Sequence, residues 1–260
     1  MLTLVARKVG TMLSALAAKL GYTLLPTWRM ENLQAARLLR DMFDLLAIDC
    51  VIDVGAHNGR FYRYLRQEVG FRGLVVSFEP IPILVEELRR RAAREQDWLI
   101  EGCALGATAG SAELNVARMK VFSSFLRPLN DELSRFEGDN TVQETVACPV
   151  RTLADVLPEL RSLHGVRNIF LKLDTQGFDL EVLKGAGDLL AGVPLLQTEL
   201  SIIPIYAGMP RYDDVLRFLE TRGFTPSGIF PVEESPFPLL IELDCILINR
   251  AYLHAPGIPA

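Results

Sequence analysis

An aspartate and two glycines are spaced as in a ligand-binding turn between a buried strand and a helix. The turn, residues 53–59, reads Asp-Val-Gly-Ala-His-Asn-Gly. Gly55 permits a tight backbone turn, and Gly59 would open the next helix, whose N-terminal NH groups can hold a carboxylate. His57 stands where the dinucleotide motif needs glycine, and no P-loop Gly-Lys-Ser/Thr follows. The pattern suits the amino-acid end of S-adenosylmethionine, although a plain strand–helix turn would look similar.

Three acids end later apolar runs and should share a rim with this turn. Glu79 closes the second run, where an acid can accept both ribose hydroxyls of a nucleoside. Asp174 and Glu199 close the fourth and fifth runs. A charge after a buried run costs free energy unless a partner or ligand compensates, and Lys172 shares the strand face of Asp174. Asp174 is therefore our preferred base or substrate-orienting acid.

These residues need elements that bring several strand ends together. Apolar runs typical of strands alternate with helical patterns. We expect strands at 50–54, 74–79, 98–103, 168–174, 194–200, 224–230 and 244–249, and helices at 31–47, 60–69, 82–94, 153–163, 179–190 and 212–222. Such alternation implies right-handed crossovers and helices on both faces. The expected fold is α/β, an open, mostly parallel, seven-stranded Rossmann-like sheet.

The chain is expected to comprise an N-terminal helical extension, residues 1–48, and one domain, residues 49–252. Within it, residues 111–150 break the rhythm, with short strands at 112–116 and 145–150 around a polar stretch. We interpret this as an inserted hairpin with a long loop, of a kind that often covers substrates. The side chains expected to contact a substrate are Ser123, Ser124, Gln176, Glu199, Tyr206 and Arg211.

Composition narrows the function classes. The chain has 260 residues, a formal charge of −5 and a sequence pI near 5.4, which argue against a broad nucleic-acid footprint. Four well-separated cysteines predict buried free thiols and a reducing cytoplasm. Residues 2–25 are largely apolar but carry Arg7, Lys8 and Lys19, so neither a membrane span nor a signal peptide fits. An amphipathic helix there could pack on the domain, form a homodimer contact or lie on a membrane surface.

Several motifs together resemble the FkbM-type methyltransferases from about residue 49 to 230. They are the turn 51–59, Phe78-Glu79-Pro80, Ala104-Leu105-Gly106, residues 171–179 with 182–186, and Gln197-Thr198-Glu199. The resemblance implies a class I methyltransferase fold that uses S-adenosylmethionine, usually to O-methylate a hydroxyl on a sugar, glycan or polyketide-like small molecule. The residues that it places against the donor are Asp53, Gly55, Ala56, Asn58, Gly59, Glu79, Pro80, Ala104, Leu105 and Asp174.

The chain departs from that family at two positions, since Gln176 replaces a frequent Glu and Cys103 a frequent Asn. Methyl transfer to an alcohol needs a base or a metal, because the hydroxyl pKa is high. His57 is a second candidate base, and Asp174 with Glu199 could instead hold a divalent cation, although two carboxylates are a weak metal signal. Methylation of RNA or protein, a non-catalytic cofactor-binding scaffold and a nicotinamide oxidoreductase remain as alternatives.

Overall fold

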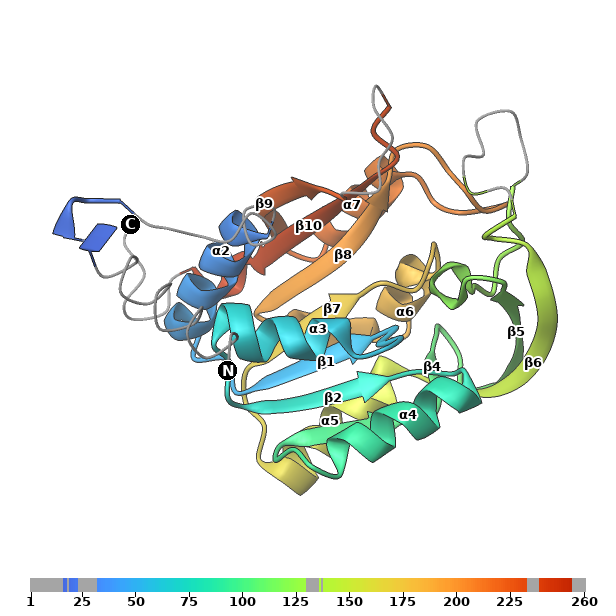
Figure 1. Cartoon of the computed structure of the whole chain (residues 1–260), viewed down its shortest axis with the longest axis horizontal. Coiled ribbons are helices and arrows are strands. Elements are labelled where there is room, and N and C mark those ends of the chain that lie inside the picture. The colour runs from blue at the N-terminus through green and yellow to red at the C-terminus, as the bar shows by residue number, and fades with distance from the viewer. Residues whose placement is uncertain are drawn as a thin grey trace, which may run out of the picture.

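A seven-stranded sheet forms the centre of the computed structural model, which describes residues 16–17, 19–22, 32–129, 136, 138–232 and 239–253. The strand order is β3-β2-β1-β7-β8-β10-β9 (Figure 1). The bounds are β3 Trp98–Glu101, β2 Leu74–Phe78, β1 Cys50–Val54, β7 Ile169–Leu173, β8 Leu195–Ser201, β10 Glu242–Asn249 and β9 Phe224–Pro231. The first five run parallel, and β10 is antiparallel to both of its neighbours. The expected open, mostly parallel sheet is confirmed.

Helices cover both faces of this sheet because its buried strands are apolar on both sides. On one face, α5 (Leu153–His164), α6 (Asp179–Lys184) and α7 (Tyr212–Glu220) share one apolar core with the alternate residues Cys50, Ile52 and Val54 of β1. On the other, α2 (Leu33–Leu45) and α3 (Arg60–Tyr64) pack around Val51. Helix α4 (Pro82–Ala92) follows β2 and contacts β3. Two apolar cores therefore hold the strand ends in fixed relative positions.

A second, smaller sheet has the strand order β4-β6-β5, with β4 Ala104–Leu105, β5 Gly110–Ala117 and β6 Val142–Arg151. The strands β5 and β6 are antiparallel, while β4 runs parallel to β6. The expected third strand, 98–103, is wrong at its end, because the chain leaves the central sheet after Glu101. A short 3₁₀ turn, Lys120–Phe122, follows β5, and Ser124 after it pairs with Asn115 of β5.

Two expected helices are also interrupted. The helix expected over 60–69 changes at Leu65 into a π-helical turn, Leu65–Val69, which ends at Gly70 with φ +83°. The helix expected over 179–190 ends at Lys184, and a 3₁₀ segment, Gly187–Gly192, follows. Gly187 has φ +53°, a left-handed backbone conformation with which the right-handed helix cannot continue.

The four cysteines are buried and free, as expected. None of the helices in the described ranges is long and apolar enough to cross a membrane. Most of the segment expected to form an amphipathic helix, residues 2–25, lies outside the described residues.

Candidate functional site

The turn after β1 is wedged between its two neighbouring strands. Gly55 has φ +81°, and a Cβ there would lie 2.0 Å from the carbonyl oxygen of Asp174. The amides of Gly55 and Ala56 donate to the carbonyl of Phe78 at 3.0 and 3.1 Å, and the amide of Asp174 donates to that of Val54 at 3.1 Å. Glycine is thus required both for the conformation and for the close approach. The contact fixes the turn directly against the residue that follows β7.

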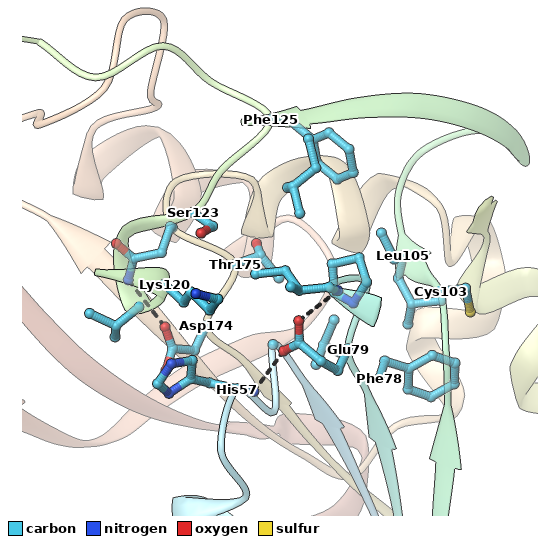
Figure 2. Close-up of a pocket in the computed structure, with 18 residues that line it drawn as sticks. His57, Phe78, Glu79, Cys103, Leu105, Lys120, Ser123, Phe125, Asp174 and Thr175 are labelled. Atoms are coloured by element: carbon cyan, nitrogen blue, oxygen red, sulfur yellow. Dashed lines mark hydrogen bonds between the residues drawn. The ribbon is translucent and has the colours of Figure 1, made fainter. Parts of the chain in front are cut away.

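Glu79 sits at the carboxyl end of β2 and is only 3% exposed. Its two carboxylate oxygens accept from the amides of His57 at 2.7 Å and Ile81 at 2.9 Å (Figure 2). Burial raises the pKa of Glu79 to about 7, although these two hydrogen bonds favour the ionised form. The carboxylate therefore holds the turn after β1 and the start of α4 in one arrangement.

A row of buried polar side chains crosses the sheet beneath the turn. The Trp98 indole NH donates to Ser77 Oγ at 3.0 Å, and Ser77 Oγ donates to Asp53 at 3.2 Å. Lys172 Nζ lies 3.3 Å from Asp53 and 3.1 Å from Asp174. Burial lowers the pKa of Lys172 but the two carboxylates raise it more, so this lysine stays charged. Because Asp53 and Lys172 are register partners on adjacent strands, Asp53 points toward Lys172 and does not line the cavity above.

The turn after β7 joins two loops from distant parts of the chain. Gln176 has φ +53°, and its amide nitrogen lies 3.3 Å from Asp174 and 3.4 Å from Glu199. Its side-chain oxygen accepts from the Tyr206 hydroxyl at 2.9 Å, and its backbone carbonyl accepts from Ser124 Oγ at 2.7 Å. The loop after β5 and the loop after β8 thus meet over this one residue.

Asp179 fastens the same turn to β8. This buried carboxylate accepts from the Thr175 amide at 2.8 Å and from the Thr175 hydroxyl. It also accepts from Thr198 Oγ1 at 2.7 Å and from the Glu199 amide at 3.2 Å. Burial raises the pKa of Asp179, and the hydrogen bonds oppose that rise. Its role is structural, because every contact stabilises the backbone between Asp174 and β8.

One cavity opens above these turns, at the carboxyl ends of the first strands. The lining residues are Val54, Gly55, His57, Phe78, Glu79, Pro80, Ile81, Cys103, Ala104, Leu105, Leu114, Lys120, Val121, Ser123, Phe125, Asp174, Thr175 and Gln176. Figure 2 shows Cys103 and Leu105 at one end, Glu79 between, and His57, Asp174 and Lys120 at the other. One end is therefore apolar, and the other carries the ionisable groups.

His57 lies at the ionisable end with φ +47°, an uncommon backbone conformation for a residue other than glycine. Burial is the main reason that its pKa is lowered, although Asp174 raises it. The imidazole is therefore neutral near pH 7 and able to accept a proton. Of the four non-glycine residues with positive φ in the described ranges, His57 and Gln176 both line the cavity. Such strain clusters where a site needs a fixed geometry.

The structure brings together about half of the residues expected from sequence. Lining the cavity are Gly55, His57, Glu79, Pro80, Ala104, Leu105, Ser123, Asp174 and Gln176. Outside its lining are Asp53, Ala56, Asn58, Gly59, Ser124, Glu199, Tyr206 and Arg211. Gly59 faces Leu88 and Trp98, and Arg211 lies by Asp213, whereas Ser124, Glu199 and Tyr206 support Gln176 from behind. Lys120 was not anticipated, because nothing in its local sequence distinguishes it from a surface lysine.

No group of three metal-ligating side chains occurs in the part of the chain that the structure describes. The amide nitrogen of Gln176 lies between Asp174 and Glu199, where the sequence allowed a cation. Burial, together with the nearby Glu242 and Asp174, raises the pKa of Glu199 well above its usual value. The Gln176 amide nitrogen, which is no cation ligand, thus stands between the two carboxylates.

The chain is similar to several known methyltransferases. A curated relative, methyltransferase sdnD of Sordaria araneosa, is 28% identical over 169 residues, which are 57% of this chain and 64% of that protein. Among solved structures, methyltransferase FkbM from Methylobacillus flagellatus aligns at 18% identity and a TM-score of 0.46, covering 76% of this chain and 43% of that one. A putative tRNA (m1A22) methyltransferase of Streptococcus pneumoniae aligns at 10% identity and a TM-score of 0.46, covering 83% and 72%.

The decisive match is to a family model. The model described as "Methyltransferase FkbM domain" matches residues 53–226, well over half of the chain. This range contains the turn after β1, Glu79, the second sheet and the turn after β7. The chain therefore belongs to the FkbM methyltransferase domain family.

Proposed function

We propose that this protein transfers the methyl group of S-adenosylmethionine to a hydroxyl on a sugar, glycan or polyketide-like small molecule. The observation that carries the proposal is the position of Glu79. Its buried carboxylate lines the cavity midway between an apolar end and an ionisable end. Family membership supports the reaction class.

The cavity fits the parts of the donor in order. Glu79 uses one lone pair of each oxygen on the amides of His57 and Ile81, so further lone pairs can accept the two ribose hydroxyls. The apolar end, Cys103 to Leu105 with Phe78, suits an adenine ring. The opposite end, with Gly55 and Asp174, then receives the methionine part. When bound there, the donor supplies an electrophilic methyl group on its sulfonium.

The protein's contribution is to position an acceptor hydroxyl and take its proton. We assign these tasks to His57 and Asp174, which line the same end of the cavity. A neutral imidazole can accept the proton, and the carboxylate of Asp174 stabilises the imidazolium that forms. Lys172 and Gln176 hold Asp174 through contacts of 3.1 and 3.3 Å, so its direction is fixed before the acceptor arrives.

Calorimetry tests the donor assignment. We expect the protein to bind S-adenosylmethionine and S-adenosylhomocysteine but not NAD, since His57 replaces the glycine that a pyrophosphate would need. Absence of binding to both sulfur nucleosides would refute the proposal, and binding of NAD alone would favour an oxidoreductase.

An acceptor screen with methyl-labelled donor tests the reaction. After an acceptor is found, His57→Asn should lower turnover by roughly 100-fold or more while donor affinity changes little. Asp174→Asn also removes a charge that faces the donor's cationic groups, so we expect it to weaken donor binding but to lower turnover by far more. Asparagine tolerates the positive φ at position 57, so the turn is preserved. His164→Asn, on the exposed face of α5, is the matched control. Unchanged turnover in both site variants would exclude them as the groups that handle the proton.

A further inference from the structure

Lys120 is a cation at the ionisable end of the cavity, and it pairs with none of the residues that the structure describes. It lies in the 3₁₀ turn that follows β5 and is the one Lys or Arg side chain among the described residues that line the cavity. Its ammonium forms no hydrogen bond or ion pair with any residue of the described ranges. By contrast, Arg118 two residues earlier pairs with Asp139 at 2.5 Å. A partly buried ammonium facing a cavity favours an anionic ligand.

The charges in the cavity indicate which anion this is. Glu79 and Asp174 are the two acids that line it, and His57 is neutral near pH 7 because burial lowers its pKa. The proposed donor has two cationic groups, its ammonium and sulfonium, and a single anionic group, its carboxylate. Asp174 complements the cations, which leaves Lys120 to complement the anion.

The order of groups along the cavity agrees with the charges. With the ribose on Glu79 and the adenine toward Cys103 and Leu105, the methionine end extends toward His57, Asp174 and Lys120 (Figure 2). The donor carboxylate is the most distant group from adenine on that side. It therefore reaches the end of the cavity that Lys120 covers.

We propose that Lys120 binds the carboxylate of the methyl donor and so holds the 3₁₀ turn Lys120–Phe122 over the methionine end. This inference rests on the proposed function, because it takes the donor to be S-adenosylmethionine. It adds a donor contact from outside the turns after β1 and β2. An acidic group on the acceptor is the other source of such an anion, and the experiment separates the two.

The test is a four-way comparison by calorimetry. Wild type and Lys120→Met are titrated with S-adenosylhomocysteine and with its decarboxylated form, S-adenosyl-3-thiopropylamine, which keeps the nucleoside, thioether and amine. We expect Lys120→Met to weaken S-adenosylhomocysteine binding roughly ten- to a hundredfold, the range for a charge-assisted contact, and to leave the decarboxylated form within about twofold. Lys120→Arg should keep most of the wild-type affinity for S-adenosylhomocysteine, whereas Arg118→Met should change the affinity for neither ligand.

Two results would overturn the inference. If Lys120→Met weakens the binding of both ligands equally, Lys120 supports the fold or contacts the nucleoside. If it weakens the binding of neither, the anion that Lys120 binds belongs to the acceptor. Failure of the wild-type protein to bind either ligand is a different result, because it removes the proposed donor itself. Binding by wild type thus separates failure of this inference from failure of the proposed function.

Discussion

Replacing Glu79 by glutamine should weaken donor binding more than any other single-atom change at the site. Glutamine keeps the shape of the side chain but exchanges one acceptor oxygen for an NH₂ group. Both wild-type oxygens already accept a backbone NH, from His57 at 2.7 Å and Ile81 at 2.9 Å. The NH₂ group must therefore face one of these donors, and it cannot accept from a ribose hydroxyl.

The magnitude follows from those two losses. A hydrogen bond to a charged group contributes about 1.5–3 kcal/mol, and a buried NH left without an acceptor costs about 1–3 kcal/mol. The buried NH already lacks an acceptor in the protein without donor, so only part of its cost weakens donor binding. We therefore expect donor binding to lose about 2–4 kcal/mol, which is roughly a 30- to 1000-fold increase in Kd. Burial raises the pKa of Glu79 to about 7, so the difference should be larger at pH 8 than at pH 6.

Calorimetry with S-adenosylhomocysteine at pH 6 and pH 8 measures this effect. Wild-type affinity should rise with pH, because ribose hydroxyls donate to the ionised carboxylate and binding then releases a proton below the pKa of about 7. Glu101→Gln, at the end of the neighbouring β3 and outside the cavity lining, is the control. A folded Glu79→Gln protein that binds within about threefold of wild type at pH 8 would refute the ribose assignment.

Four further predictions concern the frame around the cavity. Gly55→Ala places a Cβ 2.0 Å from the Asp174 carbonyl oxygen, so donor affinity measured by calorimetry should fall at least about tenfold; unchanged affinity would contradict the wedged turn. Lys172→Met leaves the fully buried Asp53 without its cation, and urea denaturation should show a loss of about 3–5 kcal/mol, whereas a loss under about 1 kcal/mol would mean that the pair is dispensable. Tyr206→Phe removes the hydroxyl that joins the two loops, so stability should fall by about 1–3 kcal/mol and protection of those loops from hydrogen exchange should drop; wild-type protection would argue against the joint. Because the pKa of Glu79 is raised to about 7, this group binds more protons in the folded chain than in the unfolded chain between about pH 4.5 and 7, and its contribution to the unfolding free energy should fall as pH rises through that window; Glu79→Gln should make the profile less steep, and an unchanged slope would contradict the assignment.

Much of the fold could be predicted because strand and helix signals agreed locally. The apolar runs in β1, β2, β7 and β8 are buried strands, and each expected helix has a helical segment at its start. Boundaries failed where tertiary contacts overrode the pattern. Cys103 continues an apolar run, but the next two residues pair with β6 instead of the central sheet. A pattern along one chain cannot say which of two sheets a strand joins.

The site was predictable where a strand end alone determines the position. Glu79 and Asp174 follow buried strands at the same edge of the sheet, so their place required only the order of strands. The direction of Asp53 depended on Lys172, which lies more than a hundred residues later and beside it only in the folded sheet. Lys120 required the path of the insertion, which its local sequence does not encode. Side chains whose direction or place depends on contacts with distant parts of the chain could therefore not be predicted.

The small sheet β4-β6-β5 links the two ends of the cavity, and this has a consequence for the order in which ligands bind and leave. Ala104 and Leu105 line the apolar end of the cavity and pair with β6, which pairs with β5, and the turn that begins at Lys120 comes soon after the end of β5. A nucleoside bound against Ala104 would therefore rest on the sheet whose strand β5 leads into the turn that carries Lys120. We expect compulsory-order kinetics, in which the donor enters before the acceptor and S-adenosylhomocysteine leaves last. Inhibition by S-adenosylhomocysteine would then be competitive against the donor and noncompetitive against the acceptor.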